Sequence, residues 1–89
     1  MPELARFYGI VIRMFVETGE RHHRPHFHVR AGEAEAVIAL DDLSVLAGDL
    51  APRERRLVEA WAELHKIELI ENWARLQGGQ PVAPIEPLR

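Results

Sequence analysis

Residues 26–40 read His-Phe-His-Val-Arg-Ala-Gly-Glu-Ala-Glu-Ala-Val-Ile-Ala-Leu, and this stretch predicts a β-hairpin. Its turn is Gly32-Glu33, with glycine first as a type II′ turn prefers, and it joins a strand at 26–31 to a strand at 34–40. In this register one face is apolar, with the cross-strand pairs Ala31 with Ala34, Val29 with Ala36, and Phe27 with Ile38. The opposite face pairs Arg30 with Glu35 and His28 with Val37. Because this one turn places all three apolar pairs on one face and the charged pair on the other, the sequence predicts which side of the hairpin packs on a core.

An apolar segment precedes the hairpin. Residues 5–16 are rich in β-branched and aromatic types, which predicts a strand. Apolar residues occupy both its even and its odd positions, so this strand needs cover on both faces. Residues 17–25 form a polar loop, and residues 41–51 are a connector with short strand character around 43–46.

The C-terminal half predicts one long helix over about 52–77. Pro52 suits the first helical position, and Gly78-Gly79 end the helix. Its apolar stripe consists of Leu57, Val58, Trp61, Leu64, Leu69, Trp73 and Leu76. At about 100° per residue, three polar residues fall inside this stripe, namely His65, Glu68 and Asn72.

We expect those three residues to form a buried polar cluster that orients the helix on the sheet, because polar groups on a buried face need hydrogen-bond partners. An acid–base pair of His65 with Glu68 is the alternative. The tail at 80–89 contains three prolines and is predicted to be extended, either lying along the body or loose. The chain is thus predicted to be a single α+β domain over 1–89. It would be an antiparallel meander of three strands, or four if 43–46 adds one, packed on one long C-terminal helix.

Composition narrows the functional classes. The chain has no cysteine, which excludes disulfides, thiol catalysis and cysteine-bound zinc. No apolar run approaches the roughly 20 residues needed to cross a bilayer, and residues 1–16 make a poor secretory signal, so we expect a cytoplasmic protein without membrane contact. The net charge of −3 argues against a protein that coats nucleic acid, although a local basic patch can form near residues 13–30.

Three residues of the first hairpin strand carry reactive side chains on one predicted face: His26, His28 and Arg30. Imidazole titrates near neutral pH, so the two histidines suit acid–base catalysis, with Arg30 or Arg13 stabilising phosphate charge. A polar strand surface that faces solvent or a partner is the plainer interpretation.

A His-x-His pair can also bind a transition metal, but two histidines are an incomplete site. A third ligand would have to be His65 or Glu68, and the predicted register turns the histidines away from the helix. The sequence therefore assigns no metal ligand and no cofactor.

Several stretches together resemble a small bacterial family catalogued as domain of unknown function 4160. They cover nearly the whole chain and lie at residues 4–14, 25–29, 61–65, 71–73 and 85–88. Family members typically have two prolines before His-Phe-His, and Arg24 replaces the first one here. The resemblance implies no established activity. It implies that members are often encoded beside a second small protein, an arrangement that resembles toxin–antitoxin pairs.

One helix covers only one face of the predicted sheet, and strand 5–16 remains apolar on its other face. Native proteins cover such surfaces, so we expect four residues of this strand to bind a partner, namely Phe7, Val11, Arg13 and Phe15. The sequence therefore predicts a small bacterial interaction module, one component of a toxin–antitoxin-like pair, that binds itself or a cognate small protein through its sheet. One alternative is a metal-independent, toxin-type ribonuclease that acts on RNA through His26, His28 and Arg30. Another is a histidine-based metal-binding regulator.

Overall fold

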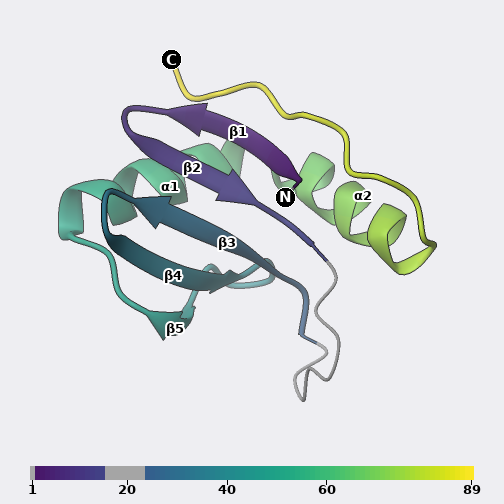
Figure 1. The fold of residues 1–89 in the computed structure, drawn as a ribbon, viewed down its shortest axis with the longest axis horizontal. Coiled ribbons are helices and arrows are strands. Elements are labelled where there is room, and N and C mark those ends of the chain that lie inside the picture. Colours follow the sequence, from purple (N-terminus) through teal and green to yellow (C-terminus); the bar gives the residue numbers. More distant parts are fainter. Residues whose placement is uncertain (1, 16–23) are drawn as a thin grey trace.

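A computed structural model describes residues 2–15 and 24–89 and has an α+β fold (Figure 1). Within these residues the elements are β1 (Glu3–Phe7), β2 (Ile10–Arg13), β3 (His26–Ala31), β4 (Ala34–Ala39), β5 (Val45–Gly48), α1 (Pro52–Leu64) and α2 (Lys66–Gln77). The strands pair antiparallel in chain order to form a five-stranded meander. Both helices lie against the same face of this sheet (Figure 1).

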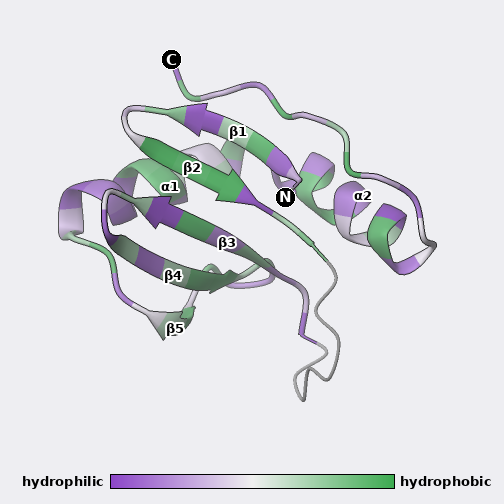
Figure 2. Ribbon diagram, viewed as in Figure 1, coloured by the Kyte–Doolittle hydropathy of each residue, from purple (hydrophilic) through white to green (hydrophobic). Residues whose placement is uncertain are grey.

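The β3–β4 hairpin has the register that the sequence predicts. Its Cα partners are His28 with Val37 and Arg30 with Glu35 on one face, and Phe27 with Ile38, Val29 with Ala36 and Ala31 with Ala34 on the other. Gly32 has a φ of 61°, which an L side chain rarely adopts, so glycine suits the first turn position. Hydrophobic residues run along β2, whereas hydrophobic and hydrophilic residues alternate along β3 and β4 (Figure 2).

The single strand predicted over 5–16 is wrong, because the chain reverses after Phe7. β1 and β2 form a hairpin whose turn residues, Tyr8 and Gly9, have φ values of 49° and 78°. Positive φ at both positions is typical of a type I′ turn. Tyrosine is a rare residue in that conformation and a common one in strands, so the aromatic and β-branched run hides the turn.

The reversal changes which residues share a face. Phe7 is only 6% exposed, and its ring centroid lies 5.6 Å from that of Trp61 in the core. Val11 lies on the opposite face of the sheet, where Arg6 is its Cα partner. The prediction that Phe7 shares a partner-binding face with Val11 and Phe15 is therefore wrong.

The predicted long helix is divided at His65, whose φ of −118° and ψ of 27° lie outside the helical region. This break changes the phase of the apolar stripe, and Leu64, predicted to be part of it, is 70% exposed. Trp61 remains at the centre of the core, with its ring centroid 6.1 Å from that of Phe27. The core thus lies between the sheet and the two helices.

The C-terminal tail lies along the body of the protein, as in the first of the two alternatives that the sequence left open. It extends from the end of α2 past β1 (Figure 1). The amide of Ile85 donates to the Leu4 carbonyl at 2.8 Å, and the indole Nε1 of Trp61 donates to the Glu86 carbonyl at 2.8 Å. Ile85 is buried. The tail therefore shields part of the outer edge of β1, a common solution for edge strands.

Candidate functional site

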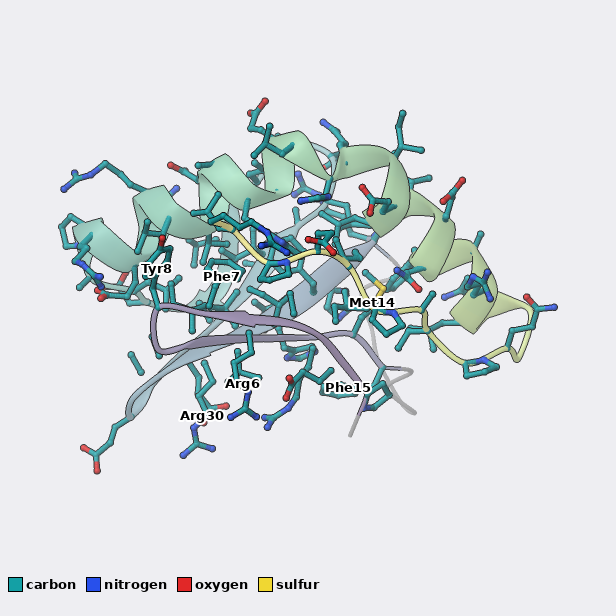
Figure 3. All side chains as sticks on the ribbon, turned by 90° about the horizontal axis from the view of Figure 1, so that it is seen from above. Arg6, Phe7, Tyr8, Met14, Phe15 and Arg30 are labelled. Atoms are coloured by element: carbon teal, nitrogen blue, oxygen red, sulfur yellow. The ribbon has the colours of Figure 1, made fainter. Side chains whose placement is uncertain are left out.

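The candidate site is the face of the sheet that points away from the helices. Figure 3 shows Arg6, Phe15 and Arg30 on this side, whereas Phe7 and Met14 lie between the sheet and the helices. The strand registers add further residues to the same side. We call this surface the open face, and it consists of Arg6, Val11, Arg13, Phe15, His28, Arg30, Glu35, Val37 and Ala47. Within the described parts of the chain, no element covers it.

Apolar side chains occupy the middle of the open face. Phe15 and His28 stack with ring centroids 4.3 Å apart and an interplanar angle of 17°. Val11 and Val37 are half-buried beside them. Stacking shields one side of the imidazole and of the phenyl ring from solvent.

Arg13 lies on the open face beside His28, its Cα partner, and its Nε atom is buried. This nitrogen has no hydrogen-bond partner among the described residues. Glu3 is the Cα partner of Arg13, but its carboxylate is bound by Arg6 at 2.8 Å through Nη2 and 3.3 Å through Nε. The hydrogen bond from Arg6, with a smaller attraction to Arg13, lowers the pKa of Glu3. Buried donors without partners are uncommon, and this one marks Arg13 as a candidate ligand-binding residue.

Arg30 is exposed on the adjacent strand. Its Nε atom donates to the carbonyl of Gly32 at 3.2 Å. Glu35 is its Cα partner, yet no ion pair joins the two side chains within the described structure. Both residues line a hollow of about 50 Å³ together with Val11, Arg13, Phe15 and His28. The open face thus presents two guanidinium groups around one small depression.

His26 does not share the exposure predicted for it with His28 and Arg30. It is 6% exposed, and its ring lies 5.3 Å from that of Trp73 in α2 and 5.3 Å from that of His28. The Nδ1 atom of His26 is 2.8 Å from the carbonyl oxygen of Arg24. The structure therefore brings the two imidazoles together but encloses one of them beside the helix.

Sequence reasoning missed the role of Arg24. Its guanidinium binds the carboxylates of Asp41 and Asp42 at 2.8 and 2.9 Å. This contact raises the pKa of Arg24 and lowers the pKa of Asp41. The signal was available, because continuing the hairpin register outward by two residues from His26 and Ala39 places position 24 opposite position 41. The exposed cluster joins the start of β3 to the end of β4.

The predicted polar cluster of the helix divides into two separate parts. Asn72 is 3% exposed, and its side chain binds Ala83 in the tail, donating from Nδ2 at 3.0 Å and accepting from the amide at 2.6 Å. The Nδ1 atom of His65 lies 2.7 Å from Glu68 Oε1, but the Glu68 side chain is 45% exposed. The prediction of one buried cluster is therefore wrong, since Asn72 positions the tail while His65 and Glu68 form a partly exposed pair at the helix break.

A second hollow, of about 270 Å³, lies beside α2. Its lining is mostly apolar and consists of Pro25, Leu40, Asp41, Lys66, Ile70 and Trp73. The sequence did not single it out, because Leu40 and Trp73 read as ordinary core residues. No group of three or more His, Asp or Glu side chains in the described residues could hold a metal ion. In the same residues, no helix has the length and hydropathy required to span a bilayer.

Comparison with known proteins gives one match. Neither the search of curated proteins nor the search of solved structures found a protein similar to this chain. The family model described as "Domain of unknown function (DUF4160)" matches residues 9–74, which include β2, the central hairpin and most of both helices. The matched region also contains Arg13, His28 and Arg30 of the open face. The chain therefore belongs to the DUF4160 family.

Proposed function

We propose that this chain is a small interaction module that binds a protein partner through the open face. An uncovered face alone is weak support, because antiparallel sheets commonly have one solvated face. The observation that carries the proposal is the composition of this face, where a buried arginine nitrogen that has no partner among the described residues lies near a stacked Phe15–His28 pair. Docking of a complementary surface would account for both features.

The identity of the partner follows from the family resemblance. Because family members are often encoded beside a second small protein, we propose that this chain is one component of such a toxin–antitoxin-like pair and that the neighbouring product docks on its sheet. Self-association through the same surface is the other form of the proposal.

The test combines co-expression with one variant on each side of the molecule. The chain and its genomic neighbour are purified together, and the mass of the complex is measured by size-exclusion chromatography with light scattering. Phe15→Glu introduces a charge on the open face and is expected to abolish the complex. Ile67→Glu changes a residue that is 73% exposed on α2 and is expected to leave the complex intact.

Circular dichroism of both variants controls for folding. A well-folded Phe15→Glu chain that still forms the complex would contradict the use of the open face. A wild-type chain that is monomeric alone and in the presence of its neighbour would contradict the proposal as a whole.

A toxin-type ribonuclease is the second candidate. It is supported by the 5.3 Å separation of the His26 and His28 rings and by the proximity of Arg13, which is the Cα partner of His28. The burial of His26 counts against it, since a general acid or base must reach its substrate. Growth arrest on induction that His28→Ala abolishes in a folded protein would support it. No RNA cleavage by the purified chain would remove it. Among the described residues, no group of three or more metal-ligating side chains supports the third candidate, a histidine-based metal-binding regulator.

A further inference from the structure

We infer that the hollow formed by Arg13, His28 and Arg30 is a binding site for a carboxylate, into which a partner protein inserts an aspartate or glutamate side chain. This inference rests on the proposed function and specifies what the partner must carry. It goes beyond that function because the site has its own ligand chemistry, which can be measured on the chain alone.

The donors come from two neighbouring strands. The Cα partner of Arg13 is His28, and that of Arg30 is Val11, so the two arginines occupy diagonal positions of the β2–β3 pair. Diagonal positions on one sheet face are roughly 7–8 Å apart, a distance that long side chains span. The guanidinium fork matches the two oxygens of a carboxylate. One acid placed between the arginines would therefore supply the acceptor that Arg13 Nε lacks among the described residues.

The size and walls of the hollow also suit a single acid. Its volume of about 50 Å³ exceeds the roughly 10–15 Å³ that one water molecule needs on the same measure, so the hollow admits a small group. Val11 and the Phe15–His28 stack form its walls. These apolar groups stand beside the polar side chains of a mixed lining, and a charge-assisted hydrogen bond is stronger beside apolar groups than in bulk solvent.

Charge on the open face favours a protein carboxylate over a nucleic-acid backbone. Glu35 lines the same hollow, and Glu3 is the Cα partner of Arg13 on the other side. A nucleic acid carries closely spaced phosphates and would meet both carboxylates, whereas a single acidic side chain on an otherwise apolar surface brings only one negative charge near Glu35. The half-buried Val37 adjacent to His28 is available for the apolar residues around that acid.

The first experiment follows the Nε–H signal of Arg13 by nuclear magnetic resonance in the full-length ¹⁵N-labelled chain. Sodium acetate is titrated against sodium chloride at equal ionic strength, and the signal is assigned by its loss in Arg13→Lys. We expect acetate, and not chloride, to shift the Arg13 signal saturably. Arg13→Lys should weaken acetate binding, followed on neighbouring backbone amides, by about tenfold or more, as expected when one charge-assisted hydrogen bond is lost.

Arg56→Lys is the matched control, because Arg56 is exposed on α1, away from the open face. It should bind acetate as the wild type does. An Arg13 signal that responds equally to acetate and chloride would overturn the inference, as would equal shifts of all arginine signals, which indicate screening alone.

A second experiment separates protein from nucleic acid as the source of the anion. A glutamate-containing peptide with apolar flanking residues and a single-stranded oligouridylate are titrated into the same sample. Stronger binding of the peptide at the Arg13 signal supports the assignment. Stronger binding of the oligouridylate, with the same loss in Arg13→Lys, overturns it in favour of phosphate recognition.

The outcomes also separate this inference from the proposed function. If acetate binds at Arg13 but no complex with the neighbouring protein forms, the carboxylate site stands and the interaction partner proposed above is wrong. If the complex forms and Phe15→Glu abolishes it while acetate leaves the Arg13 signal unchanged, the interaction proposal stands and the carboxylate site is wrong.

Discussion

The two faces of this sheet are built from alternate residues of the same strands, yet only one of them is covered by other described elements. On the helix-covered face, Ile10, Ile12, Phe27 and Ile38 are all 0% exposed and pack on Trp61 and its neighbours. On the open face, charged and apolar side chains alternate, and one arginine nitrogen is buried without a partner among the described residues. The first face is a packed core, whereas the second carries the features on which the proposed interface rests. Residue types alone would not have separated them, because β2 contributes apolar residues to both.

The largest expected effect compares one phenylalanine from each face. Phe27→Ala removes a fully buried ring and should lower the free energy of unfolding by about 3–5 kcal/mol. Phe15→Ala removes a half-buried ring from the open face and should cost about 1 kcal/mol. Urea denaturation of both variants checks the difference, with Phe27→Leu as a milder variant if Phe27→Ala does not fold. Equal losses would mean that the open face is part of the core.

The next effect concerns the tail that shields the β1 edge. Asn72→Ala leaves the amide and carbonyl of Ala83 without their partner, and it should cost about 1–3 kcal/mol. We expect faster hydrogen exchange at Ala83 and faster proteolysis within residues 80–89. Gln77→Ala, at an exposed position of the same helix, is the control. If exchange in the tail is unchanged, Asn72 does not hold it in place.

Arg13→Met tests whether the buried Nε–H of Arg13 lowers the stability of the isolated chain. Methionine keeps an unbranched chain as far as the position of Nε and removes the buried Nε–H, so the isolated chain should be unchanged or more stable by about 0.5–1 kcal/mol, while partner binding is lost. Thermal or urea unfolding measures the first part, and co-purification measures the second. A loss of stability larger than about 1 kcal/mol would assign Arg13 a structural role instead.

The smallest effect is electrostatic and lies away from both faces. Hydrogen bonds from Ser44, together with Arg24, lower the pKa of Asp42 from its ordinary value to about 2. A carboxyl whose pKa is lower in the folded state stabilises the fold above its unfolded pKa of about 3.9, and this contribution disappears as the pH falls toward 2. Stability measured between pH 5 and pH 2 should therefore fall less steeply in Asp42→Asn than in the wild type, and identical slopes would contradict this. The effect is small because the cluster is exposed.

Sequence reasoning was most reliable where the information is local. The β3–β4 register was predicted pair by pair, because a two-residue turn and a period of two allow only one arrangement that buries the apolar side. It failed where a local signal was ambiguous or absent. Tyr8 lies in a left-handed turn, although tyrosine is typical of strands. The helix break at His65 contains no proline or glycine that would predict it.

The candidate site was predicted in part. Val11, Arg13, Phe15, His28 and Arg30 do lie together on one face, as expected from their alternation in sequence. Phe7 and His26 do not, because the turn after Phe7 reverses the side to which it points and Trp73 encloses His26. Such contacts join segments that are far apart in the chain, and periodicity within one strand carries no information about them.

The sequence by itself determined the central hairpin, the placement of its two faces and the existence of a helical C-terminal half. These follow from turn chemistry and from the spacing of apolar residues, which act over a few neighbouring positions. Only the tertiary structure decided that both helices pack on the same face, that the tail shields β1 through Asn72 and Trp61, and that Arg13 has a buried nitrogen lacking a partner in the described residues. Burial and hydrogen bonding between distant segments arise only when the chain is folded, so they leave no local pattern to predict them.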